Sequence, residues 1–105
     1  MEYVTLAQVK RHNQAIGHHW FESGTMRFFR SRVSETVYPG GYFVTSEQGP
    51  DGVRRYSVRQ CVDGSISTVG EFQAYRTAAQ AHRAAQMESD AAQAFAAAGR
   101  QGFTG

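Results

Sequence analysis

The sequence predicts an α+β domain: an antiparallel meander of about four strands, with one helix before it and one after it, in two layers. Helical spacing of apolar residues at both ends, alternating apolar and polar residues in the middle, and glycine-containing turns predict this fold class. Short turns in series place consecutive strands side by side in antiparallel order. We expect both helices to cover the same apolar side of the sheet and to leave its other side open.

The first element is a helix over about residues 5–16. Thr5 and Gln8 have the spacing of a capping box, and an apolar stripe follows before Gly17, which can end the helix in a left-handed conformation. Asn13 lies on the apolar stripe and weakens it. We therefore expect this helix to lie at a margin of the core.

Alternating residues predict the strands, and three turn sequences separate them. The expected strands are 28–37, 42–45, 53–62 and 66–72, and the turns are Pro39-Gly40-Gly41, Gly49-Pro50-Asp51-Gly52 and Asp63-Gly64. Large apolar residues on these strands should form the core. The predicted core residues are Phe29, Val33, Phe43, Val58 and Phe72.

A second helix is expected to begin near Thr77, which has capping-box spacing with Gln80. Its alanines give it a flat inner face suited to close packing on a sheet; those expected there are Ala78, Ala81 and Ala85. Beyond about Asp90 the composition changes to Ala, Gln and Gly. We therefore divide the chain into a single domain over 1–90 and a C-terminal extension over 91–105, partly helical and then frayed over its last six or so residues.

Length, charge and cysteine content indicate a small intracellular protein. The 105 residues suffice for one domain, and an aromatic content of 12% is typical of a folded globule. Residues 1–60 carry eight Lys and Arg against five Asp and Glu, a net +3, while residues 61–105 carry three against four, a net −1. This surplus permits an anionic partner without indicating nucleic acid. Cys61 is alone and no export or membrane-spanning segment is evident, so we expect a cytoplasmic protein without a membrane partner.

Arginine and aromatic residues form the candidate binding surface. Side chains two residues apart on a strand share a face, as do those four apart, which groups Arg30 with Arg32 and Arg55 with Arg59. If both pairs point away from the helices, four guanidinium groups can bind phosphates, carboxylates or an acidic protein. Alternatively, these arginines are solvated residues paired with Glu35, Glu47 or Glu71. The candidate binding residues are Arg30, Arg32, Arg55, Arg59, Trp20, Tyr42 and Tyr56.

No motif indicates catalysis, a metal or a cofactor. His18 and His19 point apart in an extended segment, and no Cys, Asp or Glu lies at a spacing typical of zinc sites. Cys61 lies inside a predicted strand, where a thiol acts as a small apolar group. Both glycine-rich turns lead into strands and not into helices, which argues against a nucleotide cradle. We therefore expect a protein without metal or cofactor that is not an enzyme.

Several motifs together resemble a known family. They are His19-Trp20-Phe21, the Thr-Met-x-Phe-Phe-x-Ser-Arg core at residues 25–32, Tyr42 to Glu47, Tyr56 to Arg59 and Thr68 to Phe72. Over about residues 5–85 the chain resembles small proteins of unknown function from bacteria, phages and plasmids. That family has no assigned activity, so the resemblance implies no site residues. It implies a bacterial cytoplasm and, often, a mobile genetic element.

Three functions are open to a chain of this kind. We expect a non-catalytic interaction protein of a phage or other mobile element, which binds a host protein, such as a component of a defence system, through its arginine and aromatic surface. A single-stranded nucleic-acid-binding or regulatory protein is an alternative, with Trp20, Tyr42 and Tyr56 as stacking platforms. A small enzyme is the third, and it requires a concave pocket that holds a group with a perturbed pKa.

Overall fold

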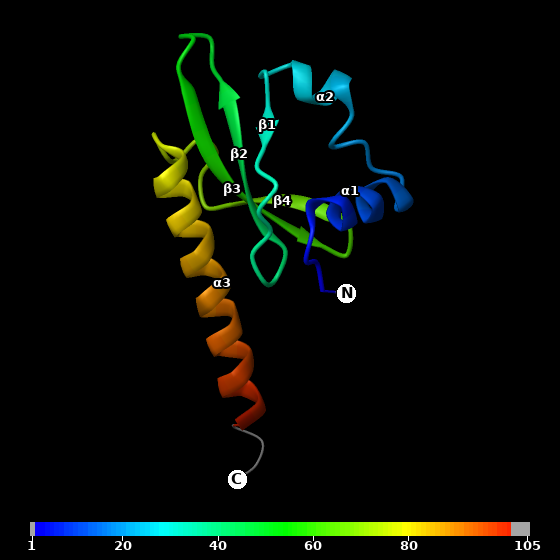
Figure 1. The fold of residues 1–105 in the computed structure, drawn as a ribbon, viewed down its shortest axis with the longest axis vertical. Helices are drawn as coiled ribbons and strands as arrows, with labels where there is room; N and C mark the ends of the chain where they lie inside the picture. The colour runs from blue at the N-terminus through cyan, green and yellow to red at the C-terminus, as the bar shows by residue number, and fades with distance from the viewer. Residues whose placement is uncertain (1, 102–105) are drawn as a thin grey trace.

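The computed structural model describes residues 2–101 and has a four-stranded antiparallel sheet at its centre (Figure 1). The elements are α1 (Leu6–Ala15), α2 (Ser23–Arg27), β1 (Arg32–Val33), β2 (Tyr42–Gln48), β3 (Arg54–Val62), β4 (Ser65–Val69) and α3 (Ala78–Gln101). The strands follow one another in the sheet in the order of the sequence. The predicted α+β meander, with a helix before it and a helix after it, is confirmed.

Helix α1 begins at the predicted capping box. The backbone N–H of Gln8 donates to Thr5 Oγ1 at 3.3 Å, and the Thr5 N–H donates to Gln8 Oε1 at 3.0 Å. Asn13 is fully buried: its Nδ2 donates to the Gly64 carbonyl at 2.8 Å, and its Oδ1 accepts from the Trp20 N–H at 3.2 Å. Asn13 interrupts the apolar stripe with a polar side chain, and this side chain ties α1 to the β3–β4 turn and to the following loop.

Strand β1 is much shorter than the predicted strand over 28–37. Its two residues, Arg32 and Val33, lie opposite Ser46 and Thr45 of β2. The chain before it turns back toward α2, since the Ser31 N–H donates to the Met26 carbonyl at 2.7 Å. This bond, with that from the Arg30 N–H to the Arg27 carbonyl at 3.1 Å, interrupts the expected strand, and the Phe29 carbonyl still accepts from the Gln48 N–H of β2 at 2.7 Å.

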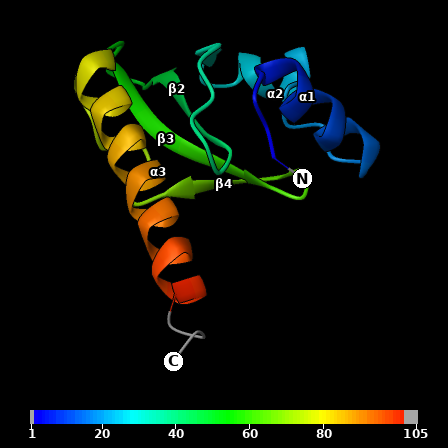
Figure 2. The same cartoon turned by 60° about the horizontal axis from the view of Figure 1, so that its bottom comes forward.

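The two long helices pack on opposite faces of the sheet, as Figure 2 shows. On one face, Leu6 and Val9 of α1 pack against Phe43 of β2. On the other, Ala81 and Ala85 of α3 pack in a second cluster. The expected arrangement of two layers, with both helices on the same side, is therefore wrong.

The reason lies in the apolar residues that β2 presents on both of its sides. Tyr42 and Val44 face α3, and Phe43 between them faces α1, because successive side chains of a strand point to opposite faces. The apolar side chains on each face are stabilised when they are buried away from water. A sheet with apolar residues on both faces therefore needs a helix or loop packed on each face.

Burial confirms some of the predicted core residues and contradicts others. Phe43 and Val58 are fully buried, and Val33 is half-buried against the α1-side cluster. Phe29 and Phe72 remain exposed, so their assignment to the core is wrong. Phe29 precedes the short β1 and Phe72 follows β4, and both residues lie outside the sheet itself.

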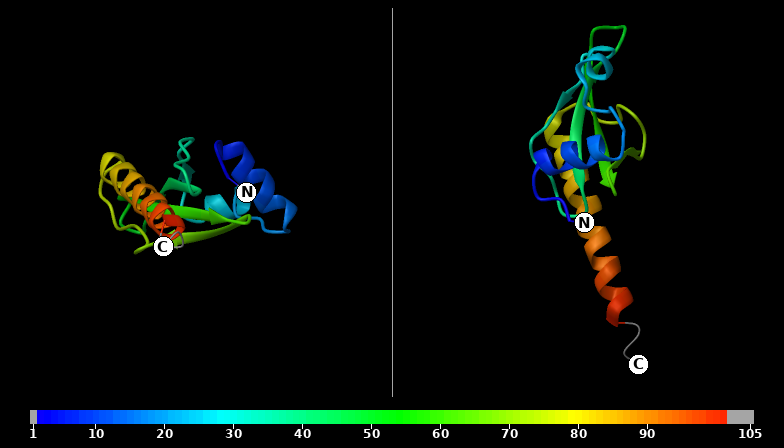
Figure 3. Two further views of the ribbon diagram at one scale, coloured as in Figure 1. Left: turned by 90° about the horizontal axis from the view of Figure 1, so that it is seen from below. Right: turned by 90° about the vertical axis from the view of Figure 1, so that its right-hand side faces the viewer.

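Helix α3 packs on the sheet through its first half and projects beyond it through its second half (Figure 3). The Gln80 N–H donates to Thr77 Oγ1 at 3.2 Å, as the predicted cap requires. Ser89 is fully buried and donates to the Pro39 carbonyl at 2.6 Å. The helix continues to Gln101, and the predicted frayed end falls mainly on residues outside the described range. Within residues 2–101, no helix is long and apolar enough to cross a membrane.

Candidate functional site

The four candidate arginines do not share one face of the sheet. Arg55 and Arg59 lie on the α1 side of β3, where Arg59 is opposite Phe43. Arg32 is opposite Ser46 and lies on the α3 side, and Arg30 precedes β1 with a positive φ of 49°. The expected surface of four guanidinium groups is therefore wrong, because strand alternation does not extend through residues 30–32.

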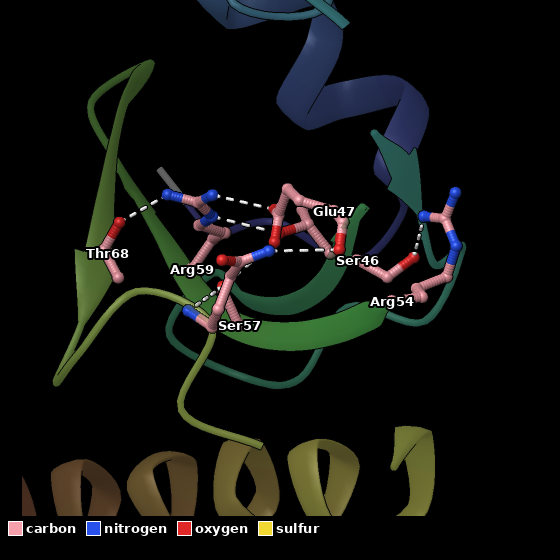
Figure 4. A network of polar contacts seen from close by, with 8 residues as sticks. Ser46, Glu47, Arg54, Ser57, Arg59 and Thr68 are labelled. Atoms are coloured by element: carbon pink, nitrogen blue, oxygen red, sulfur yellow. Dashed lines mark hydrogen bonds and ion pairs between the residues drawn. The ribbon is translucent and has the colours of Figure 1, made fainter. Parts of the chain in front are cut away.

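Arg59 belongs to a buried polar network on the α1 side of the sheet (Figure 4). Its Nη2 donates to Glu47 Oε1 at 2.9 Å, its Nε donates to Thr45 Oγ1 at 3.0 Å, and its Nη1 donates to Thr68 Oγ1. Ser57 Oγ donates to Glu47 Oε2 at 3.1 Å. Glu47 is thus one of the acidic partners that the alternative interpretation of the arginines named. Since its donors are already engaged, Arg59 acts as a structural group and not as a free docking group.

A row of aromatic rings lies alongside this network. The Phe28 and Phe29 rings are 4.6 Å apart, and the Phe29 and Phe72 rings 5.8 Å. The Arg59 guanidinium lies 5.2 Å from the Phe72 ring and 5.3 Å from the Trp20 ring, within the range of cation–π attraction. We call the four residues that carry these rings, Trp20, Phe72, Phe29 and Phe28, the aromatic row. It leads from a half-buried indole to Phe28, whose exposed fraction is 80%.

Arginines flank the exposed end of the aromatic row. A groove of about 460 Å³ is lined by residues 27–30 together with Gln48, Gly49, Pro50 and Gly52 at the end of β2 and in the β2–β3 turn. Among the described residues, Arg27 and Arg30 take part in no ion pair. An exposed apolar centre with cationic neighbours is the composition typical of a protein-binding surface.

The three candidate aromatic residues separate between the two faces. Tyr42 is buried on the α3 side, and Tyr56 is half-buried on the same side. Of the three, only Trp20 lies on the α1 side, where it packs against Phe43. The shared stacking surface expected of these three rings is therefore wrong.

The sequence prediction includes some residues of this surface and misses others. Trp20, Arg30 and Arg59 are candidate binding residues and lie in or beside the aromatic row. Phe28, Phe29, Phe72 and Arg27 are not among the predicted binding residues. The sequence Arg27-Phe28-Phe29-Arg30, two phenylalanines between two arginines, is the pattern that indicates this surface. Phe72 had no such signal, because its position depends on the path of the chain after β4.

Among residues 2–101, two groups have clearly shifted pKa values, and neither belongs to the aromatic row. Burial, followed by the contact with the Cys61 thiol, raises the pKa of Tyr3 to about 12. The backbone N–H of Val53 and the Arg55 guanidinium lower the pKa of Asp51. Within residues 2–101, no group of three His, Cys, Asp or Glu side chains is placed to hold a metal ion.

Comparison with known proteins shows the family of the chain. No curated protein and no solved structure matches it. A family model of unknown function matches residues 5–86, which includes the whole sheet and the aromatic row. The resemblance to a family without assigned activity is confirmed over this range. The chain belongs to DUF7447, a family of unknown function.

Proposed function

We propose that this protein is a non-catalytic binding module that docks on a partner protein through the aromatic row. The observation that carries the proposal is Phe28, a large apolar side chain held in solvent between Arg27 and Arg30. Aromatic residues and arginines are the usual anchors of protein interfaces, since each adds a large contact area. Transferring a fully exposed Phe side chain into an apolar pocket contributes about 1.5–3 kcal/mol.

The composition of this surface indicates which chemical groups its partner should present. An apolar pocket should receive Phe28, and carboxylates at the rim of that pocket should meet Arg27 and Arg30, because guanidinium groups form paired hydrogen bonds with carboxylates. The buried Arg59–Glu47 pair supports the row from below and keeps its own charges satisfied.

The setting of the partner follows from the resemblance of residues 25–32. This segment carries both Phe28 and its flanking arginines, and it resembles the core of small proteins from bacteria, phages and plasmids. We place the protein in the bacterial cytoplasm, as the product of a phage or other mobile element. Its partner is then a host protein, such as a component of a defence system.

Single-stranded nucleic acid is the second candidate partner, because exposed rings beside arginines can stack on bases. The geometry of the row supports it less well. The Phe28 and Phe29 rings are nearly perpendicular, at 89°, and the Phe29 and Phe72 rings meet at 56°. Successive stacked bases need neighbouring ring faces that are close to parallel. Neither of these two neighbouring pairs of rings has that orientation.

Capture from a bacterial lysate, followed by titration of the captured protein, tests the proposal. Phe28→Ala should weaken binding at least about tenfold, since truncating an interface hot spot costs about 2 kcal/mol or more and a tenfold change corresponds to about 1.4 kcal/mol. The matched control is Phe95→Ala, because Phe95 is equally exposed, at 83% against 80%, and lies on the projecting part of α3. Equal capture by the Phe28→Ala variant and the unaltered protein would refute a docking role for the row.

A titration with a labelled single-stranded oligonucleotide separates the two candidates. Nucleic-acid binding should fall steeply with salt, since it releases counterions. Binding at low salt that Phe28→Ala abolishes, without any captured protein, would favour the second candidate and contradict the first.

A further inference from the structure

We propose that a second pocket, on the α3 side of the sheet, binds a phosphoryl group. The pocket lies between the three strands β1, β2 and β3 and the start of α3, and has a volume of about 280 Å³. Its lining shares no residue with the groove at the exposed end of the aromatic row, so this proposal does not rest on the proposed function. Its polar lining consists of Arg32, Ser34, Thr45, Ser46, Arg54, Tyr56 and His82.

Two uncompensated guanidinium groups dominate the charge of this pocket. Arg54 donates to Ser46 Oγ at 2.8 Å and to the Arg30 carbonyl at 2.9 Å, and both acceptors are neutral. Within residues 2–101, neither Arg32 nor Arg54 forms an ion pair, and no Asp or Glu lines the pocket. The two neutral contacts orient Arg54 and leave its positive charge for a ligand.

Neutral donors surround the two arginines. Ser34 and Tyr56 supply hydroxyl groups, and the His82 ring is held by the Tyr38 hydroxyl, 2.9 Å from its Nδ1. Ala78, the first residue of α3, also lines the pocket, which places the positive end of the helix dipole beside the arginines. All of these groups favour an anion.

The number of donors favours a phosphoryl group over a carboxylate. A carboxylate offers two oxygens on one carbon, and one guanidinium satisfies both. A phosphomonoester or inorganic phosphate offers at least three terminal oxygens and nearly two negative charges, which suits two guanidinium groups with hydroxyls around them. The pocket is small enough that one such group with a short substituent fills it.

Titration of the isotope-labelled protein with inorganic phosphate, followed by amide chemical shifts, tests this site. We expect saturable shifts confined to residues 32–34, 44–46 and 54–56 and to the start of α3. Two further titrations use O-phosphoserine and acetate in place of inorganic phosphate. Tighter binding of O-phosphoserine identifies a phosphomonoester as the ligand, and equal binding identifies free phosphate. Acetate binding as strong as that of phosphate would overturn the choice of ligand.

Arg32→Gln is the decisive variant, because Arg32 has no hydrogen-bond or ion-pair partner among the described side chains and its loss should leave the fold intact. It should weaken phosphate binding about tenfold, as expected for one charge-assisted contact. Arg54→Gln should do the same if it folds. The control is Arg11→Gln, on the exposed side of α1. Absence of saturable shifts, or equal affinity of the Arg32→Gln variant and the unaltered protein, would overturn the proposal.

Phe28→Ala keeps the two proposals distinguishable. This substitution lies outside the lining of the phosphate pocket and should leave phosphate binding unchanged. A common loss of both activities in this variant would contradict the independence of the two sites.

Discussion

Arg59 and Glu47 form an ion pair across β3 and β2 beneath the aromatic row, with an N–O distance of 2.9 Å. The exposed fraction of the Glu47 side chain is 2%, and that of Arg59 is 11%. Hydroxyl groups of Thr45 and Ser57 complete the bonds to the carboxylate. The pair thus replaces apolar packing at the centre of this face and supports the rings on either side of the guanidinium.

Removal of Arg59 should destabilise the fold strongly. Arg59→Met leaves the Glu47 carboxylate buried without its cation, which costs about 3–5 kcal/mol in the free energy of unfolding. Urea denaturation measures this loss. Arg55→Met is the matched control on the same strand and face. Arg55 also forms an ion pair, with Asp51, but the exposed fractions of these two side chains are 37% and 49%. That substitution should cost less than about 1 kcal/mol, and equal losses in the two variants would contradict a desolvated pair.

Two phenylalanines should differ sharply in their contribution to stability. Phe43 is fully buried between α1 and Trp20, and Phe43→Ala should cost about 3–5 kcal/mol because it leaves a cavity. Phe72 is exposed beside Phe29, and Phe72→Ala should cost roughly 1 kcal/mol. Thermal and urea unfolding of both variants measure the difference. A loss for Phe72 as large as that for Phe43 would place its ring in the core after all.

Tyr3 should make the fold sensitive to alkaline pH. Burial raises its pKa from 10.0 to about 12, so the folded protein keeps the phenol neutral where the unfolded chain has lost the proton. This contribution to stability is complete below about pH 10 and is lost as the pH rises toward 12. Tyr3→Phe should be less stable at pH 7, because the Gly64 N–H loses its acceptor at 2.8 Å, and its stability should fall less steeply between pH 10 and 12.

The unaltered protein and the Tyr3→Phe variant are compared by urea denaturation across this range. The two proteins differ only at residue 3, so the difference between the two curves isolates Tyr3. Parallel curves above pH 10 would contradict a raised pKa.

Deletion of residues 97–105 should change the melting temperature little. The packing of α3 on the sheet includes Ala81, Ala85 and Ser89, and residues 91–96 are exposed. Ser89→Ala removes the 2.6 Å hydrogen bond to Pro39 and should cost about 1 kcal/mol, which lowers the melting temperature by roughly 4–8 °C. Calorimetry compares the two variants. A larger loss on deletion than on Ser89→Ala would mean that the end of the helix packs on another surface.

Local patterns in the sequence determined the elements themselves. The Thr5–Gln8 and Thr77–Gln80 spacings marked both helix starts, and the glycine turns marked the strands on either side of them. These features depend on groups within a few residues of one another. Such short-range hydrogen bonds and turn conformations can be recognised in the sequence before the path of the chain is known.

Only the tertiary structure decided which face of the sheet each side chain occupies. Pairing of Arg59 with Glu47, twelve residues earlier in the chain, is one of the alternatives that the sequence allows, but the sequence predicts the pair on a solvated face and the structure buries it. Phe72 was expected in the core and lies exposed, and the two helices cover opposite faces. Alternation along a strand predicts which residues share a face of the sheet, but not which face a helix covers. Where the helices dock depends on the total apolar area that the whole chain buries, and a local sequence pattern does not give that quantity.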